Sequence, residues 1–257
     1  ARDAAARKVR QDTLESLTRD FNKVMSGQLT MLTEDATSLQ STARAMAERA
    51  ERTGQRANAV EALGLALPGN GTIVATHASR WRVFERSAKR IVEMAKQYYL
   101  EGDASVLPRS IATYDAFKNA MALDIAMGGS TNTVLHILAI AHEASVDFTM
   151  QDIDDISRYV PTLCKVAPSS HFHVEDVHRA GGIMAIMEML SERTILNLAC
   201  KTVSGATLGQ QIQSYSIRTD PNPEAEEFFK AAPGGVRTTQ AFSQSSMYKE
   251  LDTDAAD

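Results

Sequence analysis

Apolar and small side chains recur at heptad spacing along the first 60 residues. From Leu32 the intervals alternate between four and three residues, through Leu32, Ala36, Leu39, Ala43, Met46, Ala50, Thr53, Ala57 and Val60. Leu14, Leu17, Phe21 and Val24 carry the same spacing upstream, and a break of the helix at Gly27 is left open. Several consecutive heptads are typical of a helix that packs against another helix. The pattern predicts a long coiled-coil-like helix over residues 1–60, and a helix packed on its own domain is the alternative.

Residues 61–257 carry shorter patterns. A turn with Pro68 and two glycines is expected over residues 66–72. Helical spacing then predicts helices over residues 80–99, 113–127, 131–144 and 150–159. Short strands are expected at Ile73–Thr76, Leu163–Val166 and Tyr215–Arg218. The predicted fold class is mainly α with a few short β-strands, divided into residues 1–60 and 61–257.

The stretch AMGGSTNTVLH, residues 126–136, joins two of these predicted helices. Glycine ends helices readily, and a following serine or threonine hydroxyl caps the next helix. Free backbone amides at such a helix start bind carboxylate or phosphate. The corner is therefore a candidate anion site, with a plain helix–turn–helix corner as the alternative. The residues concerned are Gly128, Gly129, Ser130, Thr131 and Asn132.

Residues 169–182, SSHFHVEDVHRAGG, gather side chains of the types that bind metals. These are His171, His173, Glu175, Asp176 and His178. Their spacing matches no zinc site, so we predict no metal ligands here. The alternative is that these side chains belong to a polar surface segment that leads into a helix capped near Glu175, where acidic residues are favoured without any ligand. A single neutral His178 directed at a pocket remains a candidate binding residue.

Other chemically capable residues are isolated. The two cysteines, Cys164 and Cys200, lie in apolar runs, where buried and inert thiols are expected. Two cysteines are also too few for the four thiolates of a typical iron–sulfur site. Arg237, in a turn, is a candidate carboxylate ligand or an exposed loop residue. Met184, Met187 and Met189 follow a helical pattern and are expected in the core.

The charge and hydropathy of the chain argue against nucleic acid as a binding partner and against a membrane span. The net charge is −5, and acids and bases are spread along the chain. Without a basic block, nucleic acid is not an expected partner. No apolar run reaches the roughly 20 residues of a membrane span, and the first residues lack the apolar stretch of a signal peptide. We expect a cytoplasmic protein.

Five blocks of the second part together resemble the dihydroxy-acid dehydratase family. They are EALGLALPGNGTIVATHA, LPRSIATYDAFKNAMALDIAMGGSTNTVLH, DFTMQDIDDISRYVPTLCKVAP, EDVHRAGGIMAI and GGVRTTQAFSQ. They follow the order and about the spacing of that family, from Glu61 to about Asp254. CKVAP and EDVHRAGG are similar to the dihydroxy-acid branch rather than to the sugar-acid dehydratases.

The resemblance implies a partial α/β dehydratase N-terminal domain and a parent reaction. The family converts small 2,3-dihydroxy acids to 2-keto acids in branched-chain amino-acid synthesis. It uses an iron–sulfur cluster as Lewis acid together with magnesium, and its members are homodimers. By the same resemblance, the Gly128–Asn132 corner is expected to bind substrate, and His178 is kept as a further candidate substrate-binding residue.

The chain departs from the family where the cofactors bind. A family cluster cysteine is expected directly before Glu61, where this chain has RTGQRANAV. Residues 188–201 also differ from the family pattern. We therefore expect no cofactor and no metal ligand in this chain, and no catalytic residue is assigned. The expected function is a dehydratase-derived chain that is inactive alone.

Residues 13–60 resemble the signalling helix of a methyl-accepting chemotaxis protein, through TLESLTRDFNKVMSG and TSLQSTARAMAERAERTGQRANAV. This implies self-association through residues 13–60, in addition to the dehydratase surface. The alternative functions are a non-catalytic coiled-coil interaction module, or fusion relic, and a small-acid binder that keeps the Gly128–Asn132 corner without chemistry.

Overall fold

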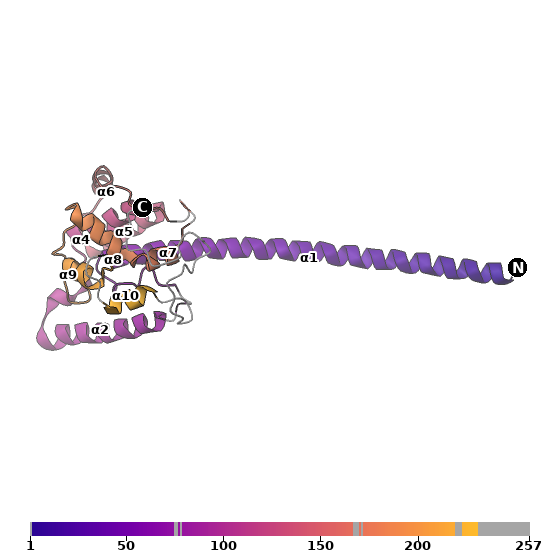
Figure 1. Cartoon of the computed structure of the whole chain (residues 1–257), viewed down its shortest axis with the longest axis horizontal. Coiled ribbons are helices and arrows are strands. Elements are labelled where there is room, and N and C mark those ends of the chain that lie inside the picture. The colour runs from indigo at the N-terminus through magenta and orange to yellow at the C-terminus, as the bar shows by residue number, and fades with distance from the viewer. Residues whose placement is uncertain are drawn as a thin grey trace. The chain divides into compact units, whose positions relative to one another are not determined.

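A computed structural model describes residues 2–74, 77, 79–166, 170, 172–218 and 223–230. The described backbone is mainly helical (Figure 1). Its helices are α1 (Arg2–Ala62), α2 (Arg80–Glu101), η1 (Ala104–Val106), α3 (Pro108–Ile111), α4 (Tyr114–Ala126), α5 (Thr131–Ala144), α6 (Met150–Ser157), α7 (Val174–Arg179), α8 (Gly182–Glu192), α9 (Leu208–Tyr215) and α10 (Pro223–Lys230). The chain divides into two compact units, residues 1–50 and 51–257.

The first unit consists of the greater part of α1. The long helix is confirmed, and it is continuous through Gly27. Thr30, Thr33 and Thr37 each donate their hydroxyl to the carbonyl four residues earlier, which keeps these side chains satisfied within the helix. Its heptad side chains are exposed where they are described, for example Leu17, Leu32 and Leu39. The coiled coil stays a prediction.

The core of the second unit is built around α4 and α8. Helix α4 contacts α5, α6 and α8, and α8 in turn contacts α7 and α9 (Figure 1). Both helices are apolar on nearly every side, as expected of helices enclosed by others. Among the fully buried side chains are Phe117, Met121, Leu123, Ile183, Met184, Met187 and Leu190. The predicted burial of Met184, Met187 and Met189 is confirmed.

Side-chain caps fix the starts of the core helices. Thr113, Ser130, Thr149 and Thr207 each accept a hydrogen bond from an amide in the first turn of the helix that follows. Such caps satisfy backbone donors that have no partner inside the helix. The four helices predicted downstream of residue 79 are confirmed to within two residues at each end, as α2, α4, α5 and α6.

The predicted strands are wrong where the structure describes them. The amides of Leu163 and Cys164 both donate to the carbonyl of Ala126, so this segment satisfies the end of α4 instead of pairing with a strand. Tyr215 ends α9, and the backbone bends at Ile217 and Arg218. Ile73 and Val74 form no strand, and residues 75 and 76 lie outside the described residues. An isolated antiparallel bridge joins Lys201 and Thr207.

Candidate functional site

The Gly128–Asn132 corner has the local geometry that its sequence predicts. Gly128 ends α4 in the left-handed region, with φ of 73°. Ser130 lies in extended backbone and caps α5, because its hydroxyl accepts a hydrogen bond from the Asn132 amide at 3.2 Å. Gly129 and Thr131 are exposed to solvent. The corner is therefore open at the surface, with a capped helix behind it.

A carboxylate of the chain itself lies at this corner. A Cβ built on Gly129 would come within 2.1 Å of Oδ2 of Asp124, so the carboxylate lies directly over the glycine. Burial raises the pKa of Asp124 to about 6, and the neighbouring Thr133 side chain and Ser130 backbone act against the rise. When Asp124 is ionised, its carboxylate therefore provides a negative charge from the chain itself at the positive N-terminal end of α5. Binding of an external substrate at this corner stays a prediction.

A second buried carboxylate, that of Glu61, organises the glycine-rich loop after α1. Its two oxygens accept hydrogen bonds from the amides of Gly69, at 2.9 Å, and Gly71, at 2.6 Å. Burial raises the pKa of Glu61 to about 7, and the two amide bonds limit that rise. Gly71 has no room for a side chain, because a Cβ there would lie 2.7 Å from Oδ1 of Asn58. Glu61 therefore fixes the loop from inside.

The same loop presents Thr72 to His178. The Thr72 hydroxyl and Nδ1 of His178 are 3.0 Å apart in a buried hydrogen bond. The rings of His77, Phe228 and Phe229 pack around His178 at centroid distances of 5.1–5.2 Å. Burial, together with nearby His77, lowers the pKa of His178 to about 3. His178 is therefore neutral at physiological pH.

Helix α7 also buries charged atoms that have no hydrogen-bond partner. Arg179 is 4% exposed, and its Nε and Nη1 are unpaired. Burial lowers the pKa of Arg179, while Asp176 acts against that shift. Asp176 accepts the His173 amide on Oδ2 at 2.8 Å, but its buried Oδ1 is unpaired. Buried polar atoms are nearly always satisfied in folded proteins, so these atoms suggest a missing polar partner.

The residues predicted from sequence fall into two groups. The described contacts of His178 are with Thr72, His77 and the α10 aromatics, whereas the corner contacts Asp124 and the segment at Cys164 and Lys165. No described contact joins the two groups. Glu175 and Asp176 lie in the first turn of α7, which agrees with the capped-helix interpretation. His171 and Arg237 lie outside the described residues.

The donor atoms of the chain do not fit an iron–sulfur cluster. The whole chain has two cysteines. Burial raises the pKa of Cys164 to about 11 and also raises that of Cys200, so both thiols are protonated near neutral pH. Within the described ranges, no group of three or more histidine, cysteine, aspartate or glutamate side chains is placed to hold a metal ion.

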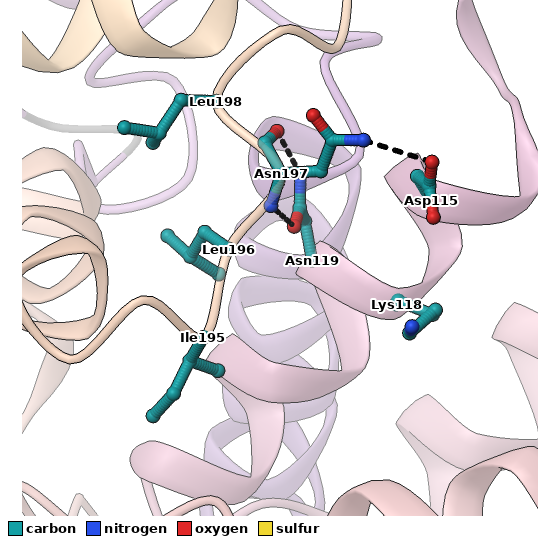
Figure 2. A pocket seen from close by; sticks show the side chains of 7 residues that line it. All are labelled: Asp115, Lys118, Asn119, Ile195, Leu196, Asn197 and Leu198. Carbon is teal, nitrogen blue, oxygen red and sulfur yellow. Dashed lines mark hydrogen bonds between the residues drawn. The ribbon is translucent and has the colours of Figure 1, made fainter.

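A surface hollow of about 490 Å³ lies between α4 and the segment after α8 (Figure 2). Asn119 and Asn197 close it by exchanging two hydrogen bonds, from Nδ2 of Asn119 to the Asn197 carbonyl and from the Asn197 amide back to Oδ1. The Asn197 side chain donates to Asp115 at 2.8 Å. Because these amides satisfy one another, we interpret the hollow as a packing seam.

Sequence reasoning missed Glu61, Thr72, Asp124 and Arg179. Each lies inside a block quoted for the family resemblance, but none has a distinctive local spacing. A glutamate eight and ten residues before two glycines was the one available signal, and it becomes meaningful only when the loop folds back onto α1.

Comparison with known protein families identifies a family that matches most of the chain. Residues 29–211 match the family described as dihydroxy-acid/6-phosphogluconate dehydratase N-terminal. The match begins inside α1 and includes the Glu61 loop, the Gly128–Asn132 corner and α7. It covers more than half of the chain. Among the described residues, no helix is long and apolar enough to cross a membrane.

Proposed function

Because the chain belongs to the dihydroxy-acid/6-phosphogluconate dehydratase family, we propose that it binds a small 2,3-dihydroxy acid without dehydrating it. The family description supplies the substrate class. The binding site proposed is the buried polar group of α7, formed by Arg179 together with His178. Substrate binding at the Gly128–Asn132 corner is the weaker candidate, because Asp124 already lies there.

The observation that carries this proposal is that Nε and Nη1 of the buried Arg179 guanidinium have no hydrogen-bond partner. An unpaired buried polar group costs about 1–3 kcal/mol of stability. A guanidinium pairs with a carboxylate through two parallel hydrogen bonds, and such pairs are stronger than neutral ones. The neutral imidazole of His178, which directly precedes Arg179 on α7, adds a group suited to a substrate hydroxyl.

We propose the absence of turnover because the described residues lack the groups that the dehydration reaction requires, whether or not the acid binds. Loss of water from a dihydroxy acid needs a Lewis acid on the leaving hydroxyl and a base at the neighbouring carbon. The two protonated thiols of this chain are a poor donor set for a cluster. No described side chain is assigned as the base.

Binding is tested by calorimetry with 2,3-dihydroxyisovalerate on the purified chain, Arg179→Met and Arg109→Met. Arg109 is exposed on α3 and serves as the matched control. We expect Arg179→Met to weaken binding at least about tenfold while raising the free energy of unfolding by about 1–3 kcal/mol. The control should change neither. Lower stability in Arg179→Met would mean that Arg179 has a structural partner, and unchanged affinity would remove the proposed site.

Turnover is tested after anaerobic reconstitution with iron, sulfide and magnesium. We expect no cluster absorption band and no 2-keto acid from the same substrate. A cluster band together with turnover would contradict the conclusion that the two thiols do not suit an iron–sulfur cluster. The variants Cys164→Ser and Cys200→Ser would then show which thiol binds the cluster.

The second candidate function is a coiled-coil interaction module formed by residues 13–60. It is favoured by the exposed apolar side chains of α1, which include Leu17, Phe21, Leu32 and Leu39. Large exposed apolar strips mark sites of association. We expect Leu32→Glu with Leu39→Glu to lower the association state measured by sedimentation, and Thr33→Glu, off the seam, to leave it unchanged. Equal sedimentation of all three chains would remove this candidate.

A further inference from the structure

The hydrogen bond between Thr72 and His178 is compatible with either direction of donation. A neutral imidazole carries its proton on one ring nitrogen, and the other nitrogen is then an acceptor. Nδ1 of His178 lies 3.0 Å from the Thr72 hydroxyl. Nε2 is buried and has no hydrogen-bond partner among the described residues. The direction of the first bond therefore decides whether Nε2 presents a proton or a lone pair.

The number of groups left without a partner separates the two directions. Thr72 is 1% exposed, and within the described part of the chain its hydroxyl bonds to His178 alone. If Nδ1 carries the proton and donates to Thr72, the hydroxyl hydrogen and the Nε2 lone pair are both left unpaired. If Thr72 donates to Nδ1, the Nε2 proton alone is left. Each buried unpaired group lowers stability, so donation by Thr72 is the favoured direction.

The ring of His178 is held in this orientation and stays neutral. The rings of His77, Phe228 and Phe229 pack around it at centroid distances of 5.1–5.2 Å. A half-turn of the imidazole would place a ring carbon against Thr72 and would break the hydrogen bond. The pKa of His178, lowered by burial to about 3, keeps the ring from taking up a second proton near neutral pH. The single ring proton therefore sits on Nδ1 or on Nε2, and Thr72 selects between them.

The backbone on two sides confines the Thr72 hydroxyl. Gly71, directly before Thr72, donates its amide to Oε2 of Glu61 at 2.6 Å. From the other side, α8 begins at Gly182, where a Cβ would lie 3.2 Å from Oγ1 of Thr72. A side chain at position 182 would therefore crowd the hydroxyl. The loop and the start of α8 together keep Oγ1 beside the imidazole.

The Nε2 proton is one of several unpaired donors on α7. Arg179 adds its buried Nε and Nη1, which also have no partner in the described structure. Asp176 contributes an unpaired acceptor, its buried Oδ1. Donors outnumber acceptors among these atoms, so they suit a ligand that presents mainly oxygen acceptors. A small hydroxy acid meets this need, because its carboxylate only accepts and its hydroxyls both accept and donate.

We propose that Thr72 is a positioning residue, which donates to Nδ1 of His178 and so keeps the ring proton on Nε2 as a hydrogen-bond donor toward an oxygen of the bound acid. The role toward the acid rests on the proposed function. The place of the proton in the free chain does not, because it follows from the buried groups of the chain itself.

Nitrogen-15 spectra of the histidine rings in the full-length chain locate the proton. His178→Gln identifies the signals of His178 by their loss. We expect Nδ1 at the shift of an unprotonated nitrogen and Nε2 at that of a protonated one. Thr72→Val removes the donated hydrogen bond at nearly constant shape, so the two shifts should move toward each other as both tautomers become populated. Thr72→Ser keeps the hydroxyl and should retain the native shifts.

The native spectrum decides the place of the proton whether or not a variant folds, because a proton on Nδ1 would overturn the proposal. Unchanged ring shifts in Thr72→Val would overturn the positioning role. Thr133→Val is the matched control, since Thr133 is also fully buried and makes no described contact with His178. It should leave the shifts of His178 unchanged, and an equal change in this control would also overturn the positioning role.

A binding cycle shows whether Thr72 acts through His178. In calorimetry with 2,3-dihydroxyisovalerate, Thr72→Val should weaken binding roughly fivefold or more, the loss expected for one hydrogen bond, and Thr72→Ser should bind as the native chain does. In His178→Gln the amide nitrogen stands in for Nε2 as a donor that does not depend on Thr72. Adding Thr72→Val to His178→Gln should therefore change nothing. An equal loss in both backgrounds would overturn the proposal.

The spectra and the calorimetry fail separately. A native chain that binds no acid but carries the proton on Nε2 would remove the proposed function and support the place of the proton. A native chain that binds the acid with the proton on Nδ1 would overturn the role of Thr72 and leave acid binding in place.

Discussion

At the scale of single residues, neighbouring glycines serve different purposes. Gly128 needs its positive φ of 73°, but a Cβ there meets nothing closer than 3.7 Å. Gly129 has ordinary backbone, yet a Cβ would overlap both the side chain and the carbonyl of Asp124, at 2.1 Å and 2.6 Å. One glycine is required by conformation and the other by space.

We therefore expect Gly129→Ala to lower the free energy of unfolding by about 3 kcal/mol, because the backbone of α4 must shift to admit the methyl group. Gly128→Ala should lower it by about 1 kcal/mol, the cost of a left-handed alanine. Urea denaturation of both variants measures the difference. Equal losses, or a larger loss for Gly128→Ala, would contradict the placement of Asp124.

Glu61 makes the stability of the chain depend on pH. Its pKa is about 7 in the folded state against the ordinary value of 4.5, so the folded chain holds this proton more tightly than the unfolded chain. The contribution is complete below about pH 4.5 and is lost as pH rises through 7. At about 1.4 kcal/mol per pH unit, the loss amounts to about 3 kcal/mol.

Glu61→Gln removes this titration. We expect the stability of the native chain, relative to that of Glu61→Gln, to fall by about 3 kcal/mol between about pH 4 and pH 8.5. Subtraction is needed because His178, with its pKa lowered to about 3, gives the opposite trend: stability is lost as pH falls below 6.5. A flat difference across this range would mean that Glu61 is solvated.

At the scale of elements, the sequence predicted α2, α4, α5 and α6 to within two residues at each end, but it predicted no helix at α9 or α10. Thr113, Ser130 and Thr149 cap helices. The side-chain hydroxyl of each accepts a hydrogen bond from a backbone amide of the first turn that has no partner inside the helix. The strand predictions failed because a short apolar run does not indicate which other segment its backbone groups will hydrogen-bond. Leu163 and Cys164 found their acceptor at Ala126, 37 residues or more upstream, and no local pattern encodes that choice.

The end of α8 carries a threonine where glycine is preferred. Thr194 has φ of 55°, its amide donates to the Ser191 carbonyl, and the Ile195 amide donates to that of Leu190. This is the Schellman arrangement, in which the left-handed residue is usually glycine. Left-handed backbone costs about 1–2 kcal/mol for a residue with a side chain, more so when it is β-branched.

We expect Thr194→Gly to raise the free energy of unfolding by about 1 kcal/mol, after subtraction of the extra chain entropy of glycine. Ser145→Gly, at the equivalent place after α5, where φ is 59°, should give a similar gain. Thermal and urea unfolding measure both. Loss of stability in both variants would show that the side chains make contacts that outweigh the backbone strain.

At the scale of the whole molecule, family membership was available from sequence but the site was not. Four of the five quoted blocks lie within the family match, and GGVRTTQAFSQ lies beyond its end at residue 211. The contact between Thr72 and His178 spans 106 residues and depends on how α7 and α10 pack. The division at residue 60 stays a prediction, while contacts divide the chain at residue 50 and the family match begins at residue 29.

This organisation predicts where α1 can be shortened. Asn58, Ala59, Glu61 and Ala62 are buried in the second unit, whereas the described side chains up to Ser41 are exposed. A chain that begins at Glu51 should keep its melting temperature within about 3 °C of the full chain, and one that begins at Leu63 should melt at least about 10 °C lower. Circular dichroism at matched concentration measures both. Equal melting of the two would show that Glu61 does not hold the loop.

The unpaired guanidinium of Arg179 has a consequence for descent. A buried arginine without a hydrogen-bond partner lowers the stability of the fold. It is kept in a lineage only by selection for binding of the ligand that pairs with it. Once the partner no longer matters, substitution to methionine or leucine is favoured by folding itself, and drift removes the arginine early. Its presence or loss among descendants of this gene therefore tests whether the proposed acid binding is under selection.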